Sequence, residues 1–243
     1  MIRASIVCVL ALCLAIPAIP APAPKETQKP LPPATPAMKQ TSENHLKLIG
    51  LAMHGYHDVQ GALPSNLLTK EGKPGLSWRV AILPFLDQQD ELYKQFKLDE
   101  PWDSENNLKL ADAIPKIYFP IRGRAEKGQT FYQMFAGKST LLDPSGKGIS
   151  LAAVTDGLSN TFMVVEGAKP VIWTKPDDLP FDGKEVPKLG GMFDGEFHAL
   201  FGDGAVRRLP KGLDADVLKA LIDRQDGQVI DLDGAIKKAE GKE

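Results

Sequence analysis

The stretch that decides the fold of this chain is residues 41–64, TSENHLKLIGLAMHGYHDVQGALP. Its apolar residues recur at the spacing of one helix face, i, i+3, i+7 and i+11: Leu46, Ile49, Met53 and, at the end, His57. Neighbouring apolar residues widen this stripe beyond what a fully solvated helix carries. We therefore expect a helix that is buried along one side against a β-sheet.

The sequence also marks both ends of this helix. Ser42 is of a residue type that caps a first turn, and Glu43 places a carboxylate where the helix dipole favours one. A loop containing glycine and proline follows the apolar stripe. The prediction is a helix from Thr41 or Ser42 to about Asp58.

An export signal precedes this region. Residues 1–23, MIRASIVCVLALCLAIPAIPAPA, combine a basic start at Arg3, an apolar core over residues 6–16 and an A-x-A-like ending. The apolar core is shorter than a membrane-spanning helix requires. We expect export to the periplasm or beyond, with cleavage at Ala23 or nearer Ala18, after which no membrane span remains. An uncleaved leader that tethers the chain to the envelope is the alternative.

The rest of the chain divides into three parts. Residues 24–40, PKETQKPLPPATPAMKQ, are expected to form a proline-rich linker, residues 41–235 a single globular domain, and residues 236–243 a polar tail. Both cysteines, Cys8 and Cys13, lie in the leader, so the stability of the exported domain depends on its core and not on disulfides. The formal net charge of -2 gives no basic surface for nucleic acid.

Short helices and strands are expected after the first helix. Ser77 and Ser104 are predicted to cap short helices, and Pro84 to bend or end the first of them. Asp214 or Asp216 is expected to start a later helix. Strand patterns, rich in β-branched and aromatic residues, occur at residues 116–121, 130–136, 160–166, 171–173 and 229–232.

A β-hairpin is predicted over residues 195–209, GEFHALFGDGAVRRL. Its turn is expected at Gly202-Asp203-Gly204, because an Asp-Gly pair supplies the positive φ that a tight turn requires. His198 lies in the first strand of this hairpin and is expected to pack or to form a hydrogen bond across the sheet.

A long proline-rich loop, residues 174–189, is the candidate binding site. Loops of this length in compact domains are commonly functional. The carboxylates of Asp177, Asp178 and Asp182 are ligands of the kind that Ca²⁺ prefers, and Trp173 at the loop entrance can stack on a ligand. The acidic residues do not follow the EF-hand spacing, so we favour a solvated loop, with Trp173 as a core or lid aromatic, and keep the binding site as the alternative.

Two histidine arrangements are weaker candidates. His54 and His57 have the i, i+3 spacing that can place two imidazoles near one metal ion, but no further ligands stand at a matching spacing, so we favour a structural role. Ser159, His198 and Asp203 contain the residue types of a nucleophilic triad, but the chain has no G-x-S-x-G elbow.

Glu166 ends the apolar strand over residues 160–166. We expect it to be solvated or paired with Lys169 or an arginine. The chain has no phosphate-binding loop, dinucleotide fingerprint or zinc spacing. The sequence therefore predicts no catalytic residues, no cofactor and no enzymatic activity.

Four segments together resemble one bacterial family. They are residues 44–66, 76–107, 151–182 and 197–209, in that order along the chain. The resemblance is to a family of secreted proteins, a domain of unknown function, with a prepilin- or pseudopilin-like start and a DG hairpin near the C-terminus. It covers about residues 40–232.

The resemblance implies an α+β, pseudopilin-like fold, in which a long N-terminal helix packs on an antiparallel β-sheet with large loop insertions. The family has no established catalytic residues to carry over. This chain departs from it in having an ordinary leader and a proline spacer in place of the prepilin start. It also has Phe193 and Phe119-Pro120 where members often have a histidine and Cys-Pro.

These observations favour an exported, non-enzymatic protein of the cell envelope that has a structural or interaction role. Its expected partner is another envelope protein. The alternative is an extracytoplasmic module that binds a small solute or a cation through the loop that carries Trp173 and the three aspartates.

Overall fold

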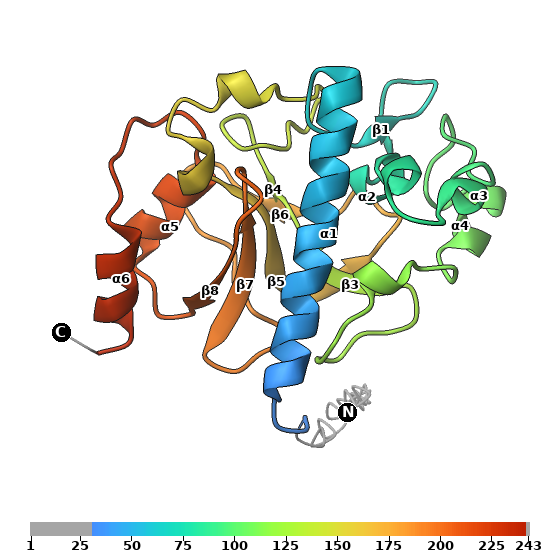
Figure 1. Cartoon of the computed structure of the whole chain (residues 1–243). Helices are drawn as coiled ribbons and strands as arrows, with labels where there is room; N and C mark the ends of the chain where they lie inside the picture. The colour runs from blue at the N-terminus through green and yellow to red at the C-terminus, as the bar shows by residue number, and fades with distance from the viewer. Residues whose placement is uncertain (1–30, 242–243) are drawn as a thin grey trace, which may run out of the picture. The chain divides into compact units, whose positions relative to one another are not determined.

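The computed structural model describes residues 31–241, which belong to one compact unit, Leu31–Glu243. The predicted leader and the first part of the linker lie outside the described residues. The fold is α+β, as the sequence predicts: a long helix, α1 (Pro36–Gln60), lies across a four-stranded antiparallel sheet (Figure 1). None of the helices among residues 31–241 is both long and apolar enough to span a bilayer.

Helix α1 begins five residues before the predicted start at Thr41. Pro36 occupies the first turn, where its missing N–H costs nothing, and the Thr35 side chain accepts a hydrogen bond from the Met38 N–H at 3.2 Å. The expectation that Ser42 caps the helix is therefore wrong. Ser42 lies inside the helix and is fully buried on the side that faces the sheet.

The main sheet has the strand order β3-β5-β7-β8. The prediction of a strand over 160–166 is confirmed, and β5 continues so far that it absorbs the separate strand expected over 171–173. The predicted hairpin is also confirmed, and its turn includes Gly204 with φ of 83°. The strands of this sheet are β3 (Gln129–Gln133), β5 (Phe162–Ile172), β7 (Glu196–Phe201) and β8 (Val206–Pro210).

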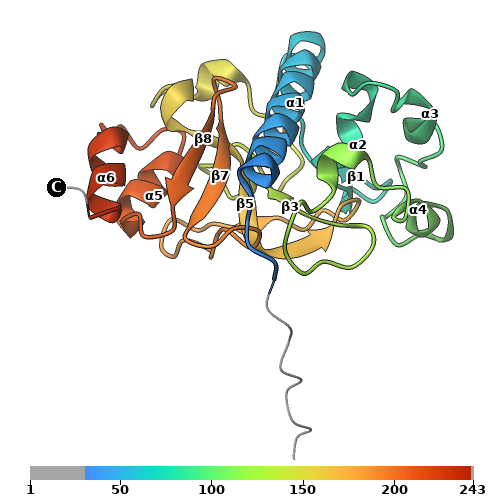
Figure 2. The same cartoon turned by 60° about the horizontal axis from the view of Figure 1, so that its bottom comes forward.

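Two hydrophobic cores lie on the two faces of this sheet. Side chains of a strand alternate between faces, so Leu200 of β7 packs in the core beneath α1, while Ala199 and Phe201 pack with α5 (Ala215–Ile222) and α6 (Leu232–Ala239). Figures 1 and 2 both show α5 and α6 on one side of α1 and, on the other, the segment that contains α2 (Trp78–Ala81), α3 (Asp90–Tyr93) and α4 (Glu105–Leu110). Helix α1 thus packs on one face of the sheet, and α5 and α6 cover the other.

Short elements fill the segments between these main parts. Ser77 and Ser104 cap the helices that follow them, as predicted, and α2 ends just before the turn that contains Pro84. Asp214 caps α5, also as predicted. The short elements are β1 (Leu67–Leu68), β2 (Pro74–Leu76), α2 (Trp78–Ala81), η1 (Leu83–Phe85), α3 (Asp90–Tyr93), α4 (Glu105–Leu110), η2 (Lys116–Tyr118), β4 (Phe135–Ala136), η3 (Leu151–Ala153), η4 (Leu158–Asn160) and β6 (Leu179–Pro180).

Two strand predictions are wrong. The segment expected as a strand over 116–121 forms a single 3₁₀ turn, η2, because Pro115 and Pro120 flank it and neither can donate to a ladder. The strand expected over 229–232 is absent because the Asp231 side chain accepts a hydrogen bond from the Gly234 N–H at 3.0 Å and starts α6 there.

Candidate functional site

Trp173, expected at the entrance of a binding loop, is part of the core. Its indole is fully buried, stacks on Tyr118 and meets Phe96 edge to face. The indole N–H donates to the backbone carbonyl of Ala111 at 2.9 Å. Every part of this side chain is therefore used in packing, and none of it faces a ligand.

Asp178 is also buried and forms an ion pair with Arg79, with 2.7 Å between the carboxylate oxygen and the guanidinium nitrogen. The same oxygen accepts hydrogen bonds from the Trp78 indole at 3.1 Å and from the Met134 backbone N–H at 2.9 Å. Burial raises the pKa of the Asp178 carboxyl, and the Arg79 charge opposes that shift. This pair joins α2 to the segment just before β6 (Leu179–Pro180).

The other two loop carboxylates remain at the surface and point to different partners. Asp177 pairs with Lys175 at 2.9 Å, and Asp182 accepts the Lys184 backbone N–H at 3.0 Å. Asp182 also lines a hollow of about 890 Å³ between residues 136–139 and 180–187. The structure thus does not bring the three aspartates together, and residues 31–241 contain no cluster of three or more His, Cys, Asp or Glu that could hold a metal.

The two histidines of α1 also separate. The His57 ring nitrogen Nε2 accepts a hydrogen bond from the Leu151 N–H at 3.3 Å. The His54 ring lies beside the β7–β8 turn, near Gly204. Each imidazole therefore packs against a different loop.

The three residues considered as a nucleophilic triad, Ser159, His198 and Asp203, form no hydrogen bonds with one another among the contacts of residues 31–241. Asp203 accepts the Ala205 N–H at 2.9 Å in the hairpin turn, and Ser159 lies in η4. His198 instead lies beneath α1, fully buried, where it contacts Glu166. The prediction that His198 forms a hydrogen bond across the sheet is confirmed.

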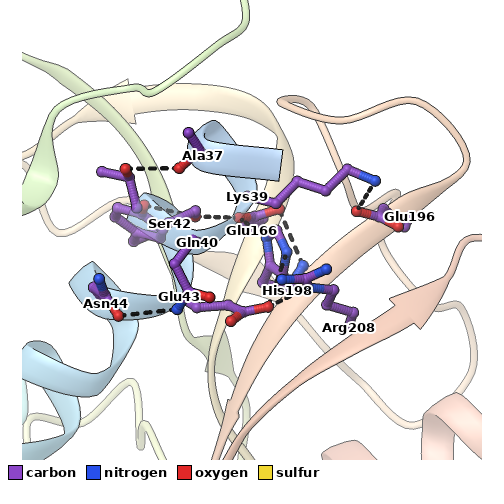
Figure 3. Close-up of polar contacts among 12 residues, drawn as sticks. Ala37, Lys39, Gln40, Ser42, Glu43, Asn44, Glu166, Glu196, His198 and Arg208 are labelled. Atoms are coloured by element: carbon purple, nitrogen blue, oxygen red, sulfur yellow. Dashed lines mark hydrogen bonds and ion pairs between the residues drawn. The ribbon is translucent and has the colours of Figure 1, made fainter. Parts of the chain in front are cut away.

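Glu166 is the centre of a buried polar cluster between α1 and the sheet (Figure 3). One of its carboxylate oxygens accepts from Ser42 Oγ at 2.5 Å and lies 2.7 Å from His198 Nδ1. The other oxygen accepts the His198 backbone N–H at 3.0 Å. The expectation of a solvated Glu166, or one paired with Lys169, is therefore wrong.

Strand geometry explains why these side chains meet. Glu166 follows Val164 by two residues on β5, and His198 precedes Leu200 by two on β7, so all four face α1. Ser42 completes the cluster from the helix, and the Tyr132 hydroxyl lies 2.8 Å from its Oγ. We call Ser42, Tyr132, Glu166 and His198 the α1 clasp.

Two ion pairs surround the α1 clasp toward the solvent. Glu43 of α1 pairs with Arg208 of β8, and its carboxylate lies 3.9 Å from His198 Nε2. Lys39, one turn earlier on α1, pairs with Glu196 of β7 at 2.8 Å (Figure 3). The N-terminal half of α1 is thus joined by polar contacts to all four strands of the main sheet.

The α1 clasp has residue types found in hydrolases but not their arrangement. A nucleophilic serine requires a base on its hydroxyl and access for the substrate. Here Ser42 Oγ donates to Glu166 rather than to His198, and all three side chains are fully buried. The arrangement can fix the position of α1, and it offers no route for a substrate.

The exposed side of α1 has a different character. Leu48 is 47% and Leu51 70% exposed, and both line a groove of about 480 Å³. Residues 85–89 and 115–117 form its other walls. We call this hollow the α1 groove.

The backbone at the rim of the α1 groove is unusual. Gln88 has φ of 57° and is the one non-glycine residue with positive φ among residues 31–241. Such conformations are costly and collect at binding surfaces.

The fold and these contacts define an α+β domain whose long helix is fixed to an antiparallel sheet by a buried carboxylate. Residues 37–137 match a family model described as a protein of unknown function (DUF1559). The match includes α1 and Tyr132 but ends before β5 and β7, which supply Glu166 and His198. No curated protein and no solved structure matches the chain.

We expect Glu166→Gln to lower the free energy of unfolding by about 2–4 kcal/mol. The amide N–H₂ group of glutamine donates hydrogen bonds and cannot accept them, so one buried donor of the α1 clasp loses its acceptor. Urea unfolding followed by circular dichroism measures this. The matched control is Glu105→Gln, whose exposed side chain only pairs with Lys109 on α4, and it should keep the wild-type midpoint. A Glu166→Gln protein as stable as the wild type would contradict the role of the clasp.

Burial raises the pKa of Tyr132 and of Tyr118 far above 10, and for Tyr132 the nearby Glu166 charge adds to this. Above about pH 10 the unfolded chain releases these protons and the folded chain keeps them, so stability falls as the pH rises, by about 1.4 kcal/mol per pH unit for each tyrosine. Urea unfolding between pH 8 and 11 should show a shallower fall for Tyr132→Phe. If the free energy of unfolding falls equally steeply with pH in the wild type and in Tyr132→Phe, this prediction is contradicted.

Proposed function

We propose that this chain is an exported, non-enzymatic protein of the cell envelope that acts by binding another protein. The leader over residues 1–23 and the proline-rich segment after it support export and display on a tether. The resemblance to secreted, pseudopilin-like proteins supports the same location. The observation that carries the binding role is the α1 groove.

The distribution of polar and apolar groups favours binding over catalysis. Glu166, His198, Arg79 and Asp178 have the chemistry that enzymes use, but each is buried and its contacts join parts of the fold. Leu51 is apolar, yet it is 70% exposed on a rigid helix. A large apolar side chain held out of the core beside a groove is typical of a protein-binding surface.

The α1 groove is suited to a protein segment rather than to a small solute. Leu48, Leu51 and Ile117 give its walls an apolar character, and its charges, Asp87 and Lys116, are exposed. A small solute generally requires polar groups that converge inside an enclosed pocket. The α1 clasp holds the opposite side of the helix, so the groove is presented on a fixed support.

Photo-crosslinking from α1 in cells, followed by recovery of the tagged chain from envelope extracts, tests this proposal. We expect an envelope protein to be recovered with the wild type and to fall about tenfold with Leu51→Lys. Val59→Lys is the matched control, because Val59 is 69% exposed on the same helix and does not line the groove. Equal recovery with both variants, no crosslinked protein, or retention of the chain in the cytoplasm would overturn the proposal.

A further inference from the structure

The rim of the α1 groove has charged side chains that form no ion pair within residues 31–241. Asp87 and Lys116 are both exposed and both line the groove. The groove therefore offers one charge of each sign that forms no ion pair among residues 31–241, and the Asp87 carboxylate accepts only a long hydrogen bond, 3.4 Å, from the Gln88 side chain.

Asp87 lies on the groove segment nearer the C-terminal end of α1, and Lys116 on the segment that leads toward its N-terminal end. Asp87 follows Phe85, whose ring packs against Tyr56 in the C-terminal part of the helix, with 5.6 Å between ring centroids. The chain that continues from Lys116 runs to the N-terminal end of the helix, where the Arg122 side chain donates to the Pro32 carbonyl at 2.7 Å.

The apolar part of the same surface contains both a projection and a hollow. Leu51 projects from α1 with 70% of its surface exposed, and the groove beside it has room for an aliphatic side chain from a partner. A surface that has both parts side by side can pair with a copy of itself across a two-fold axis.

We propose that the occupant of the α1 groove is a second copy of this chain, bound with the two α1 helices antiparallel. This rests on the proposed function, in that the groove binds protein, and it names the partner. Leu51 of each copy enters the groove of the other. Because the axis reverses the direction of α1, Asp87 of each copy faces Lys116 of its partner, and both unpaired charges are satisfied.

The expected dimer is weak. The contact is built from one helix face and two short segments, so few residues contribute to it, whereas stable complexes bury about 800 Å² per partner. Tethering of the chains at one surface would raise their effective concentration and favour pairing.

Sedimentation equilibrium of residues 31–243, from about 5 to 500 µM, tests the self-association. This range contains both hydrophobic cores and forms one compact unit. We expect a reversible monomer–dimer equilibrium that Leu51→Lys weakens at least tenfold and that Val59→Lys leaves unchanged. Circular dichroism confirms that each variant is folded. A monomer at every concentration, or a dimer that Leu51→Lys does not weaken, would overturn the inference.

A charge exchange tests the antiparallel arrangement directly. Asp87→Lys and Lys116→Glu should each weaken the dimer about fivefold, since each places like charges together across the two-fold axis. The double variant should return to within about twofold of the wild type, because the pair is restored with its signs exchanged. Additive weakening in the double variant would overturn the arrangement.

The outcomes also separate this inference from the proposed function. If residues 31–243 stay monomeric while crosslinking through α1 still recovers a different envelope protein, the groove binds protein but the second copy is not its occupant. If neither self-association nor crosslinking depends on Leu51, both proposals fail.

Discussion

The structure depends on one buried carboxylate. Glu166 carries its side chain into the interface between α1 and the sheet, where nothing but protein can satisfy it. A carboxylate in such a place is costly unless each of its oxygens meets a donor. Ser42 supplies one donor from the helix and His198 supplies two from the neighbouring strand. The helix can therefore pack on the sheet in one position only, the one that satisfies Glu166.

This constraint shapes the rest of the domain. With α1 fixed by its polar N-terminal half, the apolar stripe from Leu46 to Met53 closes over the sheet core, and the opposite side of the helix is left to solvent. A second buried pair, Arg79 with Asp178, holds the segment that forms one wall of the α1 groove. The polar interior thus positions an exposed apolar surface, and we attribute the function to that surface.

The sequence predicts the parts of this fold that depend on nearby residues. The helical stripe around Ile49 and the Asp-Gly turn at residues 203–204 are local patterns, and both predictions are confirmed. The sequence predicts a helix cap at Ser42 because serine commonly caps helices. Its position four residues before Leu46, on the buried face of the same stripe, was the available sign that it points into the core.

The clasp and the second ion pair could not be predicted in this way. Ser42 and Glu166 are 124 residues apart, and Arg79 and Asp178 are 99 apart. In one sequence, a carboxylate that forms a buried ion pair looks the same as one that binds a cation. The sequence therefore predicts the same role for Asp178 as for Asp177 and Asp182, and only its contacts with Arg79 and Met134 in the folded chain distinguish it. The role of each carboxylate is decided by contacts with residues far away in the sequence, and a single sequence does not reveal these contacts.

Hydrogen exchange of the backbone amides tests the central claim most directly. If Glu166 holds α1 to the sheet, the amides of residues 46–53 should exchange as slowly as those of β5 and β7 in the wild type. In Glu166→Gln they should lose protection before the strands do, since the helix then opens as a separate unit. Rapid exchange across α1 in the wild type, with the sheet still protected, would contradict the account.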